Sequence, residues 1–368
     1  MNSIPFRRDT LARTAETLVV GAIGGTLFEM AGFPAGLVAG SIVAAAIVSL
    51  MGRPLSVPAG LTRVILVVVG IALGSVVTPE TLAGITTYPL SIAVLSVAIL
   101  CMTAGTFTYL RLVHGWNAIS ALLGASPGAL AQIMALGAES GADVRGVVVV
   151  QTLRVILLAI LIPVGLALAG LSEPPPAPAT AAIDTSLAEL AILVAVSVAS
   201  AFLFYRIGFA GGWLFGAMIG AAALNGNGLI EARLPWWLAS ASMVAMGAVT
   251  GSRFAKIDVR MLVSYVAAAL GSFTVAITVA SLFALLAASL VPAGPADLVV
   301  AFSPGAQDTM MLLALALHLD PVFVGAHHLA RYVIVSLGVS FAANAIIRRM
   351  KKTDPVIPGG PTGREGDP

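Results

Sequence analysis

The chain has 368 residues, of which 59% are hydrophobic and 10% are charged, and its mean hydropathy is +1.02. A soluble globular surface could hardly tolerate so few charges, so the composition excludes the soluble classes and indicates a polytopic membrane protein. The net charge of +2 is too small to indicate a partner. The single cysteine, Cys101, lies inside an apolar stretch, which excludes a disulfide framework.

The first predicted element is an uncleaved membrane helix. Its apolar stretch, residues 17–28, follows three basic residues: Arg7, Arg8 and Arg13. A secretory signal has a similar beginning, but Glu29 interrupts the region in which small residues should mark a cleavage site. A second apolar stretch, residues 33–51, follows almost at once. We therefore expect residues 1–14 to form a cytoplasmic N-terminus.

Two longer runs also predict membrane helices. Residues 81–110 contain thirty positions without a charge, and residues 261–296 contain thirty-six. About twenty apolar residues already span the hydrocarbon core of a bilayer. Runs of this length indicate helices rather than the short alternating strands of a barrel.

The chain repeats itself at a fixed distance. A shift of 177 residues superposes two copies of a Ser-Pro-Gly-Ala motif, here called the SPGA turns: Ser126, Pro127, Gly128 and Ala129 on Ser303, Pro304, Gly305 and Ala306. Without any gap, the same shift matches three further pairs: Asp143 with Asp320, Gln151 with His328, and Arg154 with Arg331. The chain therefore consists of two homologous halves.

A proline-rich stretch separates the halves, because clustered prolines cannot continue a helix. The basic C-terminal end becomes rich in Gly and Pro, which indicates disorder. The expected domains are the cytoplasmic N-terminus (1–14), a first membrane repeat (15–171), an external linker (172–184), a second membrane repeat (185–347) and a disordered cytoplasmic tail (348–368).

Each half has four apolar segments, then the SPGA segment, then a last helix that carries the arginine. If the SPGA segment crosses the membrane, each half has six spans, and five basic residues fall outside: Arg145, Arg206, Arg253, Lys256 and Arg260. If it enters and returns on one side, only Arg233 remains in an outside loop. The positive-inside rule favours the second topology. We therefore expect an all-α polytopic membrane protein of two inverted-topology repeats, each with about five transmembrane helices and one re-entrant segment.

Residue types at the SPGA turns predict an anion site. Serine is a common helix N-cap, proline fits the first helical position, and glycine permits close approach by a ligand. Each turn is thus expected to begin a half-helix whose N-terminus offers free N–H donors and partial positive charge. The alternative is a Pro-Gly kink in an ordinary transmembrane helix.

The last helix of each half carries a polar face. Gln151 lies three residues before Arg154, as His328 lies before Arg331, so each pair shares one helical face. A charge within a membrane is costly and must face protein or water. Two interpretations stay open: a substrate-facing pair of cations, or structural ion pairs with Asp308, Asp143 or Asp320.

Two polar residues occur only in the second half. Gln307 and Asp308 replace Leu130 and Ala131 of the first half. An intramembrane carboxylate is a candidate for proton coupling. The histidines and aspartates fit no common zinc spacing, so no metal or other cofactor is expected. The candidate coupling groups are Asp308 and His328, and the candidate substrate-binding residues are Ser126, Pro127, Gly128, Ala129, Gln151, Arg154, Ser303, Pro304, Gly305, Ala306, Gln307, His328 and Arg331.

The duplicated pattern resembles a known family. Each SPGA turn is followed by an aspartate seventeen residues after the serine and by an arginine eleven residues further on. Over about residues 15–347 this resembles the AbrB-duplication membrane proteins of bacteria, whose members are labelled ammonia monooxygenase or AbrB-type regulator. Ala129 and Ala306 stand where the family's usual motif has a second glycine. The resemblance implies a bacterial inner membrane location.

Three functions stay open: a secondary transporter, a membrane regulator or sensor, and a membrane enzyme. We favour a transporter of a small anionic metabolite, because inverted repeats with interrupted helices at the midplane are typical of transporters. The sequence contains no plausible copper or iron ligand cluster for a monooxygenase. Its loops are too short for a DNA-binding domain, so no nucleic-acid partner is expected. The expected partners are the substrate and the bilayer, and a homo-oligomer is compatible with the sequence.

Overall fold

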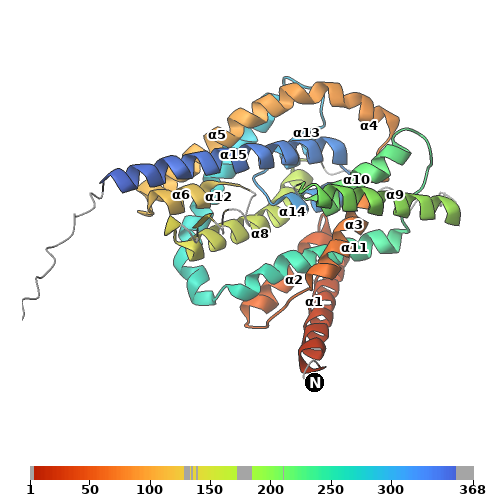
Figure 1. Cartoon of the computed structure of the whole chain (residues 1–368), viewed down its shortest axis with the longest axis horizontal. Helices are drawn as coiled ribbons and strands as arrows, with labels where there is room; N and C mark the ends of the chain where they lie inside the picture. The colour runs from red at the N-terminus through yellow and green to blue at the C-terminus, as the bar shows by residue number, and fades with distance from the viewer. Residues whose placement is uncertain are drawn as a thin grey trace, which may run out of the picture.

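The structure, a computed structural model, describes residues 4–127, 133, 136, 137, 140–171, 185–209 and 211–353 (Figure 1). Within these residues all regular elements are helices. The first half contains α1 (Ile4–Met30), α2 (Gly36–Leu50), α3 (Ala59–Gly74), α4 (Pro79–Ala83), η1 (Gly84–Thr87), α5 (Tyr88–Leu112), α6 (Ala118–Ala125) and α8 (Val144–Leu168). The second half contains α9 (Leu187–Arg206), α10 (Gly212–Asn225), α11 (Trp236–Ser252), η2 (Arg253–Lys256), α12 (Val259–Ala288), α13 (Pro295–Phe302), α14 (Gln307–Ala316) and α15 (Pro321–Thr353).

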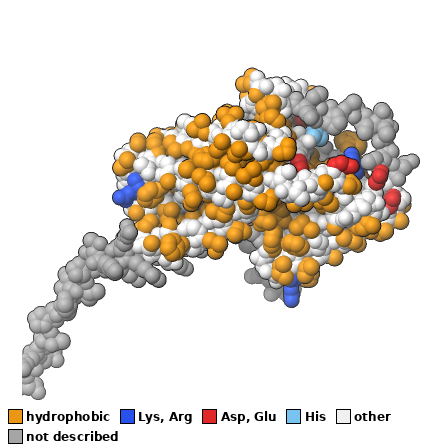
Figure 2. All heavy atoms as spheres, turned by 90° about the horizontal axis from the view of Figure 1, so that it is seen from above, with side chains coloured by type: hydrophobic (Ala, Val, Ile, Leu, Met, Phe, Trp, Pro, Cys, Tyr) orange, Lys and Arg blue, Asp and Glu red, His pale blue; other side chains and the backbone are white. Residues whose placement is uncertain are grey.

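Five helical segments of the described chain are long and apolar enough to cross a bilayer: Pro79–Leu112, Val144–Leu168, Leu187–Arg206, Val259–Ala288 and Pro321–Ile346. The apolar helices α2, α3 and α10 have 15, 16 and 14 residues. They are therefore about 21–24 Å long, shorter than a hydrocarbon core of about 30 Å. Figure 2 shows a face dominated by apolar side chains, with acidic side chains gathered toward one end. These features confirm the expected class, an all-α polytopic membrane protein.

The two halves interlock through their short helices. Helix α2 packs against α1 and also against α11 of the other half, and α10 packs in the same way against α9 and α3. Glycines permit the close approach: a Cβ on Gly74 would lie 2.2 Å from the Met218 carbonyl oxygen, and one on Gly251 would lie 2.4 Å from the Ile42 carbonyl oxygen. Gly74 of α3 and Gly251 of α11 are 177 residues apart, so the repeat matches one glycine with the other.

Each SPGA segment folds back on itself. The Asp320 N–H, just after α14, donates to Asp297 Oδ1 in the first turn of α13 over 2.8 Å. In the first half the Asp143 N–H donates to Ser120 Oγ, in the first turn of α6, over 2.7 Å. Both ends of each segment therefore lie together, as a re-entrant hairpin requires. Helix α13 has 8 residues and α14 has 10, which is about 12–15 Å or half of a bilayer core.

Candidate functional site

The serine of each SPGA turn ends a helix rather than beginning one. Ser303 is the C-cap of α13, and its hydroxyl donates to the Val299 carbonyl over 2.5 Å. Ser126 ends α6 in the same way, with its hydroxyl 2.7 Å from the Leu122 carbonyl oxygen. The predicted N-cap is therefore wrong at Ser303, because the next helix begins only after Ala306. The proline after each serine disfavours a helical conformation at the serine, so the preceding helix ends there.

Helix α14 begins three residues later than predicted. Its N-cap is Ala306, whose methyl side chain cannot accept hydrogen bonds from the first N–H groups of the helix. The turn residues Pro304 and Gly305 thus connect the C-terminal end of α13 to the N-terminal end of α14. Free carbonyls and free N–H groups meet at one place, because each helix end leaves its own backbone groups unpaired.

Arg331 satisfies the carbonyl groups of this turn. Its guanidinium donates to the Ser303 carbonyl, to the Gly305 carbonyl over 2.6 Å and to Nδ1 of His328. The other ring nitrogen of His328, Nε2, lies 3.0 Å from the Val300 carbonyl oxygen. A cation at a helix C-terminus also complements the helix dipole. Arg331 and His328 therefore form the support behind the second turn.

The first half repeats this support with different residues. Gln151 Nε2 donates to the carbonyls of Leu123 and Ser126, over 3.0 and 2.7 Å. Arg154 donates through Nη2 to the Gly124 carbonyl over 2.7 Å. Its Nε and Nη1 groups are buried and have no hydrogen-bond partner within the described residues. Arg154 is only 2% exposed, so these two N–H donor groups are unpaired inside the protein and away from solvent.

The ion pairs considered from the sequence do not form among the described residues. Asp143 and Asp320 instead cap the N-termini of α8 and α15, where Asp320 Oδ1 accepts the N–H groups of Val322 and Phe323. Their other carboxylate oxygens accept hydrogen bonds from tyrosines of the opposite half, with Tyr265 on Asp143 and Tyr88 on Asp320. Eleven helical residues span about 16 Å, too far for an ion pair with the following arginine.

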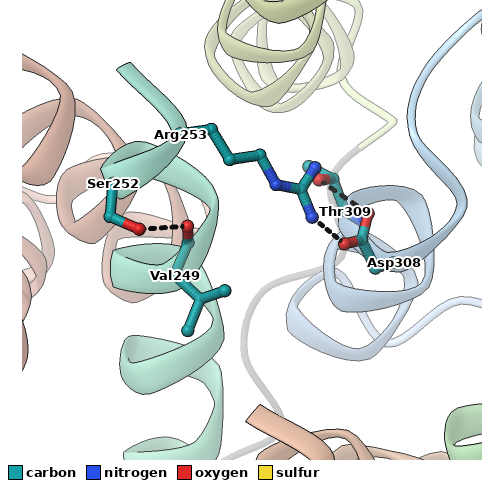
Figure 3. A network of polar contacts seen from close by, with 5 residues as sticks. All are labelled: Val249, Ser252, Arg253, Asp308 and Thr309. Atoms are coloured by element: carbon teal, nitrogen blue, oxygen red, sulfur yellow. Dashed lines mark hydrogen bonds and ion pairs between the residues drawn. The ribbon is translucent and has the colours of Figure 1, made fainter. Parts of the chain in front are cut away.

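Asp308 forms an ion pair with a residue that was not among the site residues predicted from the sequence. Arg253, in η2, donates to Asp308 Oδ2 in the first turn of α14 (Figure 3). Oδ1 of Asp308 accepts the Thr309 N–H over 2.9 Å. The side chains of Arg253 and Asp308 are 32% and 22% exposed, so both reach water. The expected alternative, a pair between Asp308 and Arg331, is wrong.

A small cavity joins the two halves at the second turn. Its volume is about 30 Å³, which is room for one or two waters. It is lined by residues of α8, of α11 with η2, and of the second SPGA turn: Gln151, Thr152, Arg154, Val155, Ile156, Thr250, Arg253, Phe254, Pro304, Gly305 and Ala306. The buried Thr250 hydroxyl also has no partner among the described residues. The cavity therefore offers unpaired donors and two guanidinium groups.

The predicted site residues separate into three groups. Gln151, Arg154, Pro304, Gly305 and Ala306 line the cavity. Ser126, Pro127, Ser303, His328 and Arg331 are buried in or behind the two turns. Gln307 and Asp308 lie in the first turn of α14, whereas Gly128 and Ala129 lie outside the described residues.

Sequence reasoning missed Arg253 and Thr250. Both have apolar counterparts in the first half, Val76 and Leu73, just as Asp308 has Ala131. This shared asymmetry was the available signal. No group of three or more metal-ligating side chains occurs in the part of the chain that the structure covers.

The fold and the paired hairpins define a duplicated all-α membrane protein with a polar cavity between its halves. A family model described as "Transition state regulatory protein AbrB" matches residues 37–347, so the chain belongs to the AbrB family. The chain is also 25% identical to the "Uncharacterized protein YhjN" of Bacillus subtilis (strain 168), over 344 residues that cover 86% of this chain and 89% of the relative.

Proposed function

We propose that the protein is a secondary transporter of a small anion, which binds in the cavity between the two halves. The observation that carries this proposal is Arg154, whose buried guanidinium lines the cavity with two N–H donor groups unpaired among the described residues. A buried charge without a counter-charge is costly, so the site should attract an anion. Binding brings the cavity close to neutrality, which lowers the cost of moving its walls across the membrane.

The second SPGA turn would supply further donors to the anion. Asp308 Oδ1 already accepts the Thr309 N–H, but the Ala306 side chain caps none of the first-turn N–H groups of α14, and the N-terminal end of a helix favours negative charge. The free hydroxyl of Thr250 is a further donor. Arg331 stays on the carbonyl side of the turn and is a positioning residue in this proposal.

Coupling to protons is assigned to Asp308 rather than His328. Nδ1 of His328 accepts from Arg331 and Nε2 donates to the Val300 carbonyl. A neutral imidazole fits this arrangement, because a protonated ring could not accept from the guanidinium. Asp308 is partly exposed and paired with Arg253, so it is the carboxylate beside the cavity that water can reach.

Flux measurements in proteoliposomes test the proposal. We expect vesicles with the wild-type protein to exchange small carboxylates, and vesicles with Arg154→Gln to lose this flux while the protein stays folded. Gly60→Ala is the matched control, because a Cβ there has no atom within 4 Å. Flux of amines or metal ions, or undiminished anion flux in Arg154→Gln, would reject the assignment.

A regulatory or sensing role is the second candidate, and the family description favours it. A membrane sensor would bind the same anion without moving it. Binding to purified protein together with the absence of flux in vesicles would therefore favour the sensor. We propose no enzymatic role.

The proposed location is the bacterial inner membrane with both termini in the cytoplasm. Labelling of single cysteines tests this after Cys101→Ser. A cysteine introduced at Ala177 should react with an impermeant reagent added to whole cells, whereas one at Lys351 should react only after the cells are opened. The opposite pattern would contradict the inverted topology.

A further inference from the structure

Two arginines from different halves line one cavity, and the carboxylate of Asp308 pairs with one of them. Arg154 comes from α8 of the first half and Arg253 from η2 of the second. Asp308, at the start of α14, engages Arg253 and leaves Arg154 without a counter-charge. The hydrogen bond between Arg253 and Asp308 (Figure 3) thus determines how many guanidinium groups a ligand can use.

The charge of the cavity follows from the protonation of Asp308. With Asp308 ionised, its charge cancels that of Arg253, and the lining keeps the positive charge of Arg154. With Asp308 protonated, Arg253 is released and both guanidinium groups of the lining are available to a ligand. Arg331, buried behind the second turn, adds a further positive charge in either state. Of the other titratable groups with described side chains on helices packed against α14, Arg331 and His328 are bound to the turn carbonyls, His327 is bound to Ser91, and Arg63 lies over Tyr205 and Trp213. Asp297 and Arg145 lie in the first turns of α13 and α8, and Tyr332 packs against an apolar cluster.

We propose that the site binds a compact oxyanion with two negative charges together with one proton, which Asp308 takes from water. This inference rests on the proposed function of the Arg154 cavity. Protonation turns the Asp308 carboxylate into a carboxylic acid that no longer holds Arg253. The guanidinium of Arg253 then donates to the bound dianion opposite Arg154, so the two guanidinium groups of the lining face two negative charges. The cavity has room for one or two waters, so it must widen to admit a tetrahedral anion, and a compact ligand requires the least widening.

Sulfate and methanesulfonate are suitable probes, because both are tetrahedral and keep charges of minus two and minus one throughout the neutral pH range. Dissociation constants come from calorimetric titration of the full-length protein in detergent. Asp308→Asn mimics the protonated carboxyl group and should release Arg253 permanently. We expect its sulfate dissociation constant to fall about tenfold, the effect of one added charge-assisted hydrogen bond. Methanesulfonate binding should change several-fold less.

The double variant Asp308→Asn with Arg253→Gln tests whether the tighter sulfate binding depends on Arg253. It should lose the tenfold improvement for sulfate and still bind methanesulfonate through Arg154. Proton uptake gives a second readout that does not depend on affinity. Sulfate binding by the wild-type protein should consume a proton, seen as a difference in heat between buffers of different ionisation enthalpy, and Asp308→Asn should abolish that difference.

The outcomes separate this inference from the proposed function. If neither anion binds, or if Arg154→Gln binds methanesulfonate undiminished, the proposed anion site fails and this inference fails with it. If methanesulfonate binding depends on Arg154 but Asp308→Asn improves both anions equally or neither, the dianion inference alone is overturned. A gain for sulfate that survives Arg253→Gln would also overturn it.

Discussion

Arg154 and Arg331 hold the same position in the two halves of the chain but have different partners. Arg331 is bound by two carbonyls of its own turn and by His328. Arg154, which lines the cavity, donates to one carbonyl and keeps two N–H groups unpaired within the described structure. The two halves thus share the way in which a polar side chain supports each turn, whereas the two arginines differ in how many of their donor groups are bound.

The largest expected effect is a difference in unfolding free energy between the two arginine variants. Arg331→Gln should reduce the free energy of unfolding by about 2–6 kcal/mol, because two buried carbonyls each lose a partner worth about 1–3 kcal/mol. Arg154→Gln leaves one carbonyl unpaired but removes an unpaired buried charge, so its loss should be smaller. Thermal unfolding of both variants in detergent measures the difference. Equal losses would remove the distinction between a structural and a ligand-binding arginine.

The interlocked glycines should behave symmetrically. Gly74→Ala and Gly251→Ala each push a Cβ into a backbone carbonyl of the opposite half, and such overpacking costs about 1–3 kcal/mol. We expect similar losses in unfolding free energy from both. Gly60→Ala is the control, because its Cβ meets open space and it should stabilise α3 by up to about 1 kcal/mol. A loss at only one of the two interlocked glycines would show that the halves are not packed alike.

The crossed tyrosines test the hairpin ends. Tyr265 donates to Asp143 over 2.5 Å and Tyr88 to Asp320 over 3.4 Å. Tyr265→Phe should therefore cost about 1 kcal/mol of unfolding free energy, and Tyr88→Phe should cost less. Chemical or thermal unfolding of the two variants checks the order. A larger loss for Tyr88→Phe would contradict the hydrogen-bond geometry.

The smallest expected effect concerns Arg253. Its ion pair with Asp308 is partly exposed, so Arg253→Gln should change the unfolding free energy by no more than about 1 kcal/mol. Arg53→Gln breaks the more exposed pair with Glu16 and serves as the control, because that pair lies away from the cavity lining. Only Arg253→Gln should alter anion binding. A large stability loss from Arg253→Gln would assign the pair to the scaffold.

The fold was largely readable from the sequence because its repeat is a property of the chain itself. The 177-residue shift predicts the recurrence of helices, and it also relates contacts that no local pattern contains. Gln151 forms a hydrogen bond with the Leu123 carbonyl, and His328 forms one with the Val300 carbonyl. The shift of 177 residues matches Gln151 with His328 and Leu123 with Val300. Periodicity and composition therefore sufficed for the class.

The site was only partly readable, for two physical reasons. Residue type alone suggested serine N-caps, but the proline that follows each serine ends the preceding helix at that serine. Residue charge alone suggested ion pairs for the arginines, although their partners are backbone carbonyls of another helix. Arg253 was interpreted only as a topology signal, because nothing local reveals that it reaches Asp308.

The most direct test of the account is the position of a bound anion. Crystals of the protein grown with selenate, an anomalous scatterer shaped like sulfate, would locate it without reference to transport. We predict an anomalous peak in the cavity beside Gly305 and Ala306, placed so that a selenate oxygen lies within hydrogen-bond distance of Nε or Nη1 of Arg154. A cavity filled only by water, with selenate bound elsewhere or nowhere in the same crystals, would contradict the claim that Arg154 is held ready for an anion.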